Sequence, residues 1–369
     1  MSPKRIFIAA TSQNDGKTTV SLGLLFNLRE QYKNIGFIKP IGQRYLEEQG
    51  VKVDEDSVLI ERALETCQVQ CGLKDMSPVA VERGFTEKYI LEPDKEAITN
   101  HIKESFGRVA KDRELVIIEG TGHAGVGSVF DHSNATVAKL LGAKVVLISS
   151  GGVGRPIDEI MLNKALFEKM GVELLGVIVN KVRVEKFDKV DKLVRKGLAR
   201  QGIRTLGVMP FYPMLTAPTM GQIIEETSFE LLSGGEHLEN KAINVIVGAM
   251  EPHNALNYFS DYSLVITPGD REDMITTTLS QHLAKARNEG GVFVSGIILS
   301  GGIRPHPAIM KMLENSNIPI LFAKKDTYTV ASKVHDLAVK VRPEDTEKIQ
   351  KIVTMVKGFV DIEAIMENL

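Results

Sequence analysis

Short apolar runs alternate with amphipathic helical segments from the start of the chain to about residue 209. The runs are rich in Val, Ile and Leu, which is typical of strands buried on both faces of a parallel sheet. The predicted strands are Arg5–Ala10, Ile35–Lys39, Leu115–Ile118, Lys144–Ile148, Leu174–Val179 and Thr205–Met209. The predicted helices include Thr18–Leu28, Asp94–Lys111, Asn134–Leu141, Pro156–Met170 and Phe187–Gln201. This order predicts an α/β fold, with a mostly parallel sheet covered by helices and ligands at the carboxyl ends of its strands.

The alternation weakens after Pro213 and restarts beyond a polar stretch that contains Gly234 and Gly235. We therefore expect a first domain at residues 1–232, a linker at 233–242 and a smaller α/β domain at 243–342. Its predicted strands are Asn244–Ala249, Ser263–Thr267, Phe293–Leu299 and Pro319–Phe322, and its predicted helices are Asn254–Phe259, Asp270–Arg287, Pro307–Asn315 and Tyr328–Val339. Residues 343–369 are expected to form two C-terminal helices.

The loop between the first strand and the first helix ends in Gly16-Lys17-Thr18. This strand–loop–helix order is the context that a phosphate-binding P-loop requires, although Thr11 stands where the usual first glycine would be. Loop N–H groups and the helix N-terminus can bind a polyphosphate, Lys17 would reach the β- and γ-phosphates, and the Thr18 hydroxyl would bind Mg²⁺. The expected nucleotide contacts are Thr11, Ser12, Gln13, Asn14, Asp15, Gly16, Lys17, Thr18 and Thr19.

Two acidic segments could complete a magnesium site. Glu119 ends an apolar strand, as the acidic residue of a Walker-B element does, and Asp56 belongs to an acidic cluster before a helix. We expect Thr18, Asp56 and Glu119 as metal ligands, although capping of the helix would also favour aspartate at this position. Lys39 ends the second strand, where it could stabilise negative charge or simply be exposed. Lys17, Lys39 and Glu119 are therefore the candidate catalytic residues.

Two further strand ends offer contacts for a nucleotide base. Asn180 could pair with adenine through its amide or serve as a turn residue, and Pro210 ends the next strand. Arg183 stands where a GTPase would carry the aspartate that recognises guanine. This residue favours ATP over GTP.

Three strand-to-helix turns of the second domain carry charged or hydroxyl residues: Asp270, Arg271, Arg304, Asp326 and Thr327. They could converge on a small ligand or on a partner subunit. The alternative is that Asp270 and Thr327 only cap the helices that follow them.

The composition is that of an ordinary globular protein of 369 residues, with 43% hydrophobic residues and a net charge of −2. No basic field indicates nucleic-acid binding, and no apolar run is long enough for a membrane span or a signal peptide. We therefore expect a cytoplasmic protein. The two cysteines, Cys67 and Cys71, have the spacing of neither a zinc site nor a redox pair and are expected to be structural.

The first domain resembles dethiobiotin synthase and its relatives among the P-loop ATPases, through Thr11–Thr18, Lys39-Pro40, Asp56, Glu119-Gly120 and Asn180. Gly269-Asp270-Arg271 resembles the signature of the DRTGG domain, although Glu272-Asp273-Met274 replaces its Thr-Gly-Gly. This pair of domains is similar to the N-terminal regulatory region of long bacterial phosphate acetyltransferases. The catalytic acetyltransferase domain would follow that region and is absent from these 369 residues, so acetyl transfer is not expected of them.

The resemblance leaves three hypotheses open. The leading one is a Mg-ATP-binding regulatory module that acts on an enzyme partner or a second subunit. The second is an ATP-dependent ligase that phosphorylates a small carboxylate or carbamate, because the lysine of dethiobiotin synthase that matches Lys39 helps to bind the carbamate. The third is a structural oligomerisation module with a relic P-loop. We also expect a homo-oligomer, with a dimer as the first guess because dimers are the commonest homo-oligomers.

Overall fold

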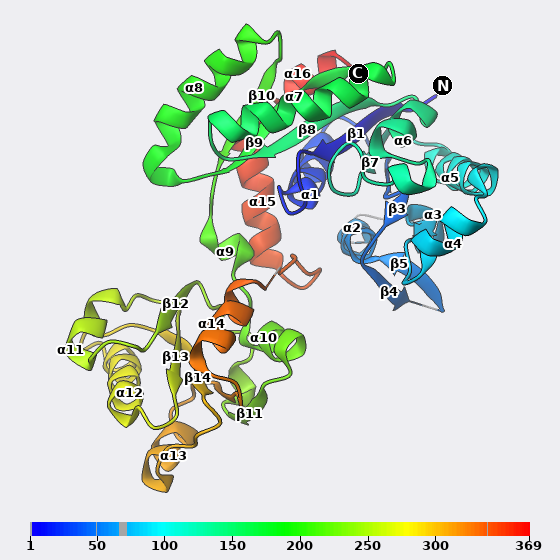
Figure 1. The fold of residues 1–369 in the computed structure, drawn as a ribbon. Coiled ribbons are helices and arrows are strands. Elements are labelled where there is room, and N and C mark those ends of the chain that lie inside the picture. Colours follow the sequence, from blue (N-terminus) through cyan, green and yellow to red (C-terminus); the bar gives the residue numbers. More distant parts are fainter. Residues whose placement is uncertain (1, 49, 66–71, 338) are drawn as a thin grey trace. The chain divides into compact units, whose positions relative to one another are not determined.

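The computed structural model describes residues 2–48, 50–65, 72–337 and 339–369 (Figure 1). The chain forms two compact units, Met1–Phe211 together with Val341–Leu369, and Tyr212–Lys340. Cys67 and Cys71, expected to be structural, lie outside the described residues. Within the described parts of the chain, no helix combines the length and the apolar character that crossing a membrane requires.

The first unit is built on a six-stranded sheet in which every neighbouring pair is parallel. Its strand order is β10–β9–β8–β1–β7–β2. The strands are β1 (Lys4–Ala10), β2 (Ile35–Ile38), β7 (Leu115–Glu119), β8 (Lys144–Ser150), β9 (Leu174–Val182) and β10 (Thr205–Pro210). The apolar residues of the central strands are fully buried, as expected for a sheet covered on both faces. The prediction of a parallel sheet covered by helices is confirmed.

The helices of this sheet also lie close to their predicted positions. They are α1 (Lys17–Leu28), α5 (Lys95–Ala110), α6 (Asn134–Leu140), α7 (Gly154–Lys169) and α8 (Phe187–Arg200). The sequence pattern predicted no strand between β2 and α5. The structure there has two small sheets, β3 (Ile41–Gly42) with β6 (Val79–Ala80) and β4 (Tyr45–Glu48) with β5 (Val51–Asp54), and the helices α2 (Glu55–Glu65), α3 (Leu73–Met76) and α4 (Phe85–Leu91).

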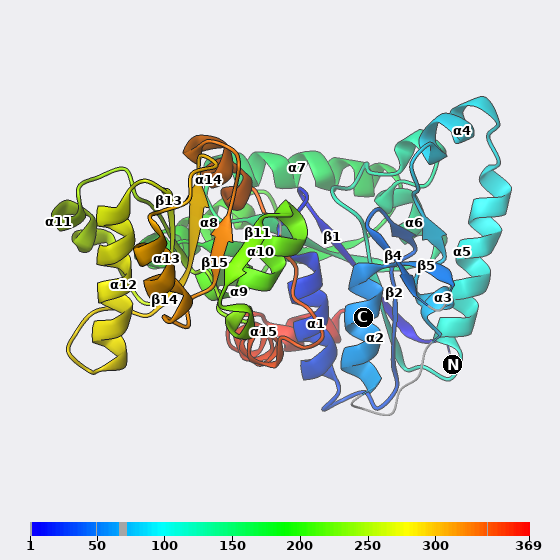
Figure 2. The ribbon, with the colours of Figure 1, turned by 90° about the horizontal axis from the view of Figure 1, so that it is seen from below.

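The C-terminal segment returns to the first unit as α15 (Thr346–Phe359) and α16 (Ile362–Glu367). Helices α1 and α15 lie side by side on one face of the sheet, whereas α7 covers the opposite face (Figure 2). Gly23 allows this close approach, because a Cβ atom there would lie 2.3 Å from Cγ2 of Val356. The Asn27 amide also donates to the Val353 carbonyl oxygen at 3.0 Å. The helix that follows the P-loop is thus held by the end of the chain.

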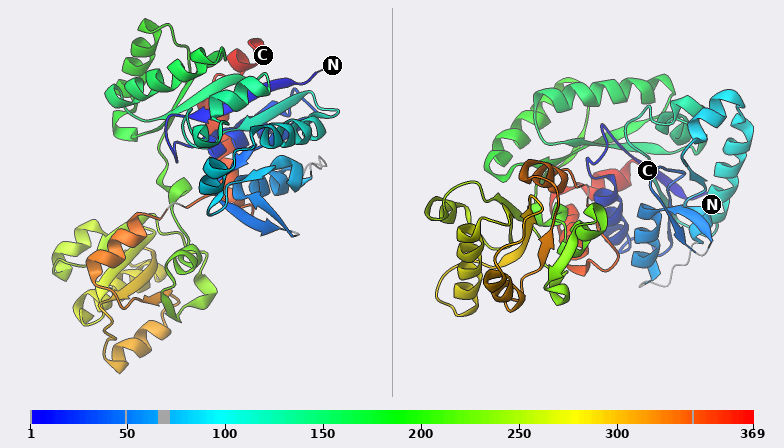
Figure 3. Two further views of the ribbon diagram at one scale, coloured as in Figure 1. Left: turned by 45° about the vertical axis from the view of Figure 1, so that its right-hand side comes forward. Right: turned by 60° about the horizontal axis from the view of Figure 1, so that its bottom comes forward.

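The second unit has a five-stranded sheet in the order β11–β15–β14–β13–β12. Its strands are β11 (Glu230–Ser233), β12 (Asn244–Val247), β13 (Ser263–Pro268), β14 (Val294–Ser300) and β15 (Ile320–Phe322), and its α-helices are α9 (Pro213–Thr216), α10 (Met220–Thr227), α11 (Pro252–Ala255), α12 (Glu272–Ala286), α13 (Pro307–Glu314) and α14 (Thr327–His335). Only β11 runs antiparallel to its neighbour. Helices α10 and α14 fill one face of the sheet, and α12 and α13 the other (Figure 3).

The boundary predicted at residues 233–242 differs from this division of the chain. Residues 212–242 belong to the second unit because β11 pairs with β15, and Met220 and Ile223 of α10 are buried in its core. Ala242, in the predicted linker, is buried in the same core. Residues 343–369 were predicted as separate helices but pack within the first unit.

This boundary gives a test with two fragments of the chain. A fragment of residues 212–340 should unfold in one cooperative transition in urea, monitored by circular dichroism, because it keeps a complete sheet and both covering layers. A fragment of residues 243–340 should lack that transition, since losing β11 and α10 exposes core residues of the remaining strands. If the two fragments unfolded with equal cooperativity and stability, the domain boundary would lie at the predicted linker, residues 233–242.

Candidate nucleotide-binding site

The predicted phosphate-binding loop lies at the carboxyl edge of the first sheet, between β1 and α1. Gly16 has a φ of +104°, in the left-handed region, and a Cβ atom there would lie 2.2 Å from Nδ2 of Asn180. The Asp15 carboxylate accepts hydrogen bonds from the Thr11 hydroxyl at 2.8 Å and from the Ser12 N–H at 2.7 Å. The loop is therefore shaped by its own side chains, and its last residue must be glycine.

Residues of β9 (Leu174–Val182) support the loop from a second side. The Asn180 amide donates to the Asp15 carbonyl oxygen at 2.9 Å, and Lys181 Nζ donates to the Asn14 carbonyl oxygen at 2.6 Å. Asn180 is 3% exposed, so this amide holds the loop in place. The predicted contact of Asn180 with adenine stays a prediction, as does a base contact of Pro210, which ends β10 at the same edge.

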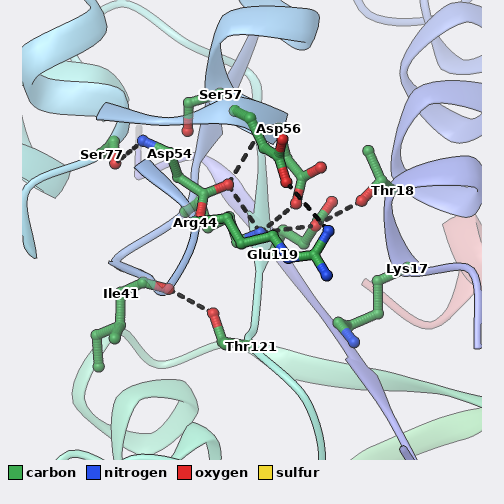
Figure 4. A network of polar contacts seen from close by, with 12 residues as sticks. Lys17, Thr18, Ile41, Arg44, Asp54, Asp56, Ser57, Ser77, Glu119 and Thr121 are labelled. Carbon is green, nitrogen blue, oxygen red and sulfur yellow. Dashed lines mark hydrogen bonds and ion pairs between the residues drawn. The ribbon is translucent and has the colours of Figure 1, made fainter. Parts of the chain in front are cut away.

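Three carboxylates converge on the ammonium group of Lys39, which follows β2. Figure 4 shows these carboxylates, of Asp54, Asp56 and Glu119, close together. Lys39 Nζ lies 2.9 Å from Asp54 Oδ1 and 3.6 Å from Glu119 Oε1, and it also forms an ion pair and hydrogen bond with Asp56 Oδ2. Lys39 is 5% exposed, so the group is buried. The Thr18 hydroxyl donates to Glu119 Oε1 at 3.0 Å and joins the P-loop helix to this cluster.

The sequence pattern did not predict the small sheets, and these sheets help to place two of the carboxylates. Asp54 ends β5 and Asp56 lies in the first turn of α2. The Asp54 N–H donates to the Ser77 hydroxyl at 2.8 Å, and Asp54 Oδ1 accepts from the Asp56 N–H at 3.0 Å. The Lys39 N–H donates to the Met76 carbonyl oxygen at 2.7 Å. The loop around α3 therefore fixes both sides of the ion pair.

Burial and charge shift the protonation equilibria of this cluster. Burial alone would lower the pKa of Lys39, but the carboxylates of Asp56, Glu119 and Asp54 together raise it well above its usual range. Burial raises the pKa of Glu119, and Asp56 adds to this shift, whereas Lys39 opposes it. Burial lowers the pKa of Lys17, against the attraction of Glu119. Lys39 is thus held in its charged form.

The residues present fit a magnesium ion that arrives with phosphate groups. Glu119 Oε2 is buried and has no hydrogen-bond partner among the described residues, so one carboxylate oxygen is left for a ligand. Together with Thr18 and Asp56, this gives the few protein ligands that Mg²⁺ normally takes, with phosphates and water as the rest. No three His, Cys, Asp or Glu side chains of the described chain are arranged to hold a metal ion by themselves.

The candidate residues of the second unit lie at one edge of its sheet, after β13, β14 and β15, as predicted. Their side chains already have partners within the unit: Arg271 binds Asp273 at 2.9 Å, Arg304 binds Glu230 at 2.7 Å, and the Thr327 hydroxyl lies 2.8 Å from that of Ser300. Asp326, and neither Asp270 nor Thr327, caps a helix here, because its carboxylate accepts the Thr329 N–H at 3.0 Å. A ligand at this edge stays a prediction.

Sequence reasoning missed Arg44 as a neighbour of the cluster. It follows β3, lies beside the carboxylates in Figure 4, and its guanidinium is 3.8 Å from Glu55 Oε1. Its backbone carbonyl accepts the Glu55 N–H at 3.0 Å. No sequence signal marks this arginine, because only the unpredicted β4–β5 hairpin brings it beside α2.

Comparison with known proteins agrees with both units. A family model described as an AAA domain matches residues 4–219. The chain belongs to this AAA domain family. A second model, the DRTGG domain, matches residues 222–337, which follows the AAA domain directly and lies within the second unit, Tyr212–Lys340. The predicted succession of a P-loop domain and a DRTGG domain is confirmed.

Relatives that match nearly the whole chain are phosphate acetyltransferases. Those of Pseudomonas aeruginosa and Nitratidesulfovibrio vulgaris are 28% and 26% identical, over 97% and 96% of this chain. The matches cover 51% and 50% of those proteins, so the chain spans about half the length of the curated relatives it matches. The relation to phosphate acetyltransferases is thus confirmed for that half.

Solved structures resemble the two units only distantly. The MinD cell division protein of Aquifex aeolicus is 16% identical, covers 57% of this chain and 84% of its own, and has a TM-score of 0.37. The CBS and DRTGG domains of the regulatory region of Clostridium perfringens pyrophosphatase, solved with the activator diadenosine tetraphosphate, are 16% identical, covering 45% and 83%, at a TM-score of 0.28. Likenesses at these scores carry no functional argument.

The P-loop geometry predicts how a methyl group added at Gly16 changes the stability of the protein. Gly16→Ala should lower the free energy of unfolding by about 1–3 kcal/mol, because the residue is left-handed and its Cβ would meet the Asn180 amide. Urea denaturation of the purified variant measures this loss. Gly154→Ala is the control, since nothing lies within 4 Å of a Cβ there, and it should change stability by less than about 0.5 kcal/mol. Equal effects of the two substitutions would contradict the described loop.

Proposed function

We propose that the first unit binds Mg-ATP at its P-loop and that the chain acts as a regulatory or sensing module. The observation that carries this proposal is the hydrogen bond from Thr18 to Glu119, at 3.0 Å, beside the buried Lys17. These residues lie about a hundred positions apart in sequence, yet they form the pair that would hold the magnesium ion of a bound nucleotide. The site is therefore assembled from the parts that phosphate binding requires.

ATP is the proposed nucleotide, because Arg183 replaces the aspartate that would select guanine. Lys17 would contact the β- and γ-phosphates, and Thr18, Asp56 and Glu119 would hold the metal ion. A Mg-ATP-dependent module of this kind would work in the cytoplasm. Its partner would be an enzyme or a second copy of the chain, which fits its relation to half of a phosphate acetyltransferase.

The surroundings of Lys39 favour a regulator over a ligase. A ligase would need this lysine to attract a small carboxylate or carbamate. In the structure its charge is matched by three carboxylates, so a small anion that arrives without a metal ion would find no free positive charge there. A ligase would release ADP only when its small substrate is added, and a relic P-loop would ignore ATP altogether. The intact Gly16-Lys17-Thr18 sequence weighs against the relic.

Loss of the P-loop lysine should weaken nucleotide binding. Lys17→Ala is expected to weaken Mg-ATP binding at least tenfold, or by about 1.4 kcal/mol, because the ammonium group is placed for the phosphates. Isothermal titration calorimetry of the full chain measures the affinity. Lys33→Ala, which removes an exposed lysine of the same unit, is the matched control and should bind as the wild type does. Unchanged affinity in Lys17→Ala would overturn the site assignment.

Nucleotide binding should also be sensed by α15. Helix α1 begins at Lys17 and packs on α15 through Gly23 and Asn27, so ordering of the P-loop should slow amide hydrogen exchange in residues 346–359. Hydrogen exchange with mass spectrometry, with and without Mg-ATP, measures this protection. Protection limited to residues 11–20, with none in α15, would contradict a regulatory path through this helix.

A further inference from the structure

We propose that the Lys39 ammonium holds the place of the divalent cation until a nucleotide binds, so that Lys39 keeps free metal out of the site. This inference rests on the proposed nucleotide function of the same site and adds its regulation. It starts from the buried cluster, in which one ammonium group is shared by Asp54, Asp56 and Glu119. Two of these three carboxylates are the proposed magnesium ligands.

The three buried carboxylates of the cluster require a positive charge beside them. Three buried carboxylates without a counter-ion would cost several kcal/mol each in desolvation and repulsion. Lys39 supplies one positive charge at 2.9 Å from Asp54 and 3.6 Å from Glu119, and it faces three carboxylates with this single charge. Glu119 Oε2 also has no hydrogen-bond partner among the described residues. The cluster is therefore stabilised by Lys39 and still suited to a cation of higher charge.

A tethered lysine competes well against free Mg²⁺. The ammonium group is part of the chain, so it stays at high local concentration, whereas a magnesium ion must leave part of its hydration shell to enter a buried site. Nucleotide changes this balance in two ways. Its phosphates supply further oxygen ligands for the metal, and they offer Lys39 a new anionic partner close to the P-loop. Metal and nucleotide should therefore enter together.

The experiment measures Mn²⁺ binding to the full chain in the absence of nucleotide, from the electron paramagnetic resonance signal of free Mn²⁺. The wild type should bind Mn²⁺ weakly, and Lys39→Met should bind it at least tenfold more tightly. Mn²⁺ should also raise the melting temperature of Lys39→Met more than that of the wild type. Lys52→Met is the matched control, because Lys52 lies on the same β5 strand as Asp54 but pairs with Glu82 at the surface.

A second variant guards against loss of folding, because Lys39→Met removes the ammonium group that the three carboxylates share. The double variant Lys39→Met/Asp54→Asn removes one of these charges and retains Asp56 and Glu119. Its amide oxygen can still accept the Asp56 N–H, as Asp54 Oδ1 does at 3.0 Å. It too should bind Mn²⁺ more tightly than the wild type.

Equal Mn²⁺ affinities of the wild type and both Lys39 variants would overturn this inference. Tight Mn²⁺ binding by the wild type without nucleotide would do so as well. The proposed function fails in a different experiment, namely when the wild type does not bind Mg-ATP. In that case the comparison of Mn²⁺ affinities still decides whether Lys39 excludes free metal.

Discussion

The first unit depends on one buried ion cluster, in which Lys39 neutralises part of the charge of Asp54, Asp56 and Glu119. These residues come from the end of β2, the end of β5, the first turn of α2 and the end of β7. Such a set of charges is stable only while each carboxylate has a partner, because removing one member of a buried ion pair costs about 3–5 kcal/mol. The cluster therefore joins four elements at the same sheet edge as the P-loop.

Helix α1 connects the ion cluster to helix α15. Thr18 at its beginning contacts Glu119, and Gly23 and Asn27 in its middle contact α15. In addition, α2 carries Asp56 at its first turn, while its Arg62 lies 3.3 Å from Glu344 just before α15. The two helices that begin at the candidate site thus both contact the segment where the chain re-enters the first unit. The proposed nucleotide sensing would use this arrangement to reach the C-terminal helices.

The alternating pattern was enough to predict the parallel strands, their helices and the P-loop, because fully buried strands and a Gly-Lys-Thr turn have local signatures. The pattern failed for strands that form only through tertiary contacts. Strand β11 has exposed residues and forms only because β15 lies beside it, so the domain boundary was misplaced. Strand β4 is equally exposed, and without the β4–β5 hairpin neither the Asp54–Lys39 pair nor the place of Arg44 can be foreseen. Lys39, Asp56 and Glu119 were each predicted as site residues, but the ion pairs of Lys39 with these carboxylates were not.

The most direct test of the account is a crystal structure of the full chain with Mg²⁺ and a non-hydrolysable ATP analogue. The account predicts β- and γ-phosphates against Lys17 and the P-loop N–H groups, a magnesium ion bound by the Thr18 hydroxyl and a Glu119 oxygen, and Lys39 turned from the carboxylates toward the phosphates. Phosphates bound elsewhere, or a metal ion bound while Lys39 keeps all three carboxylate contacts, would contradict it.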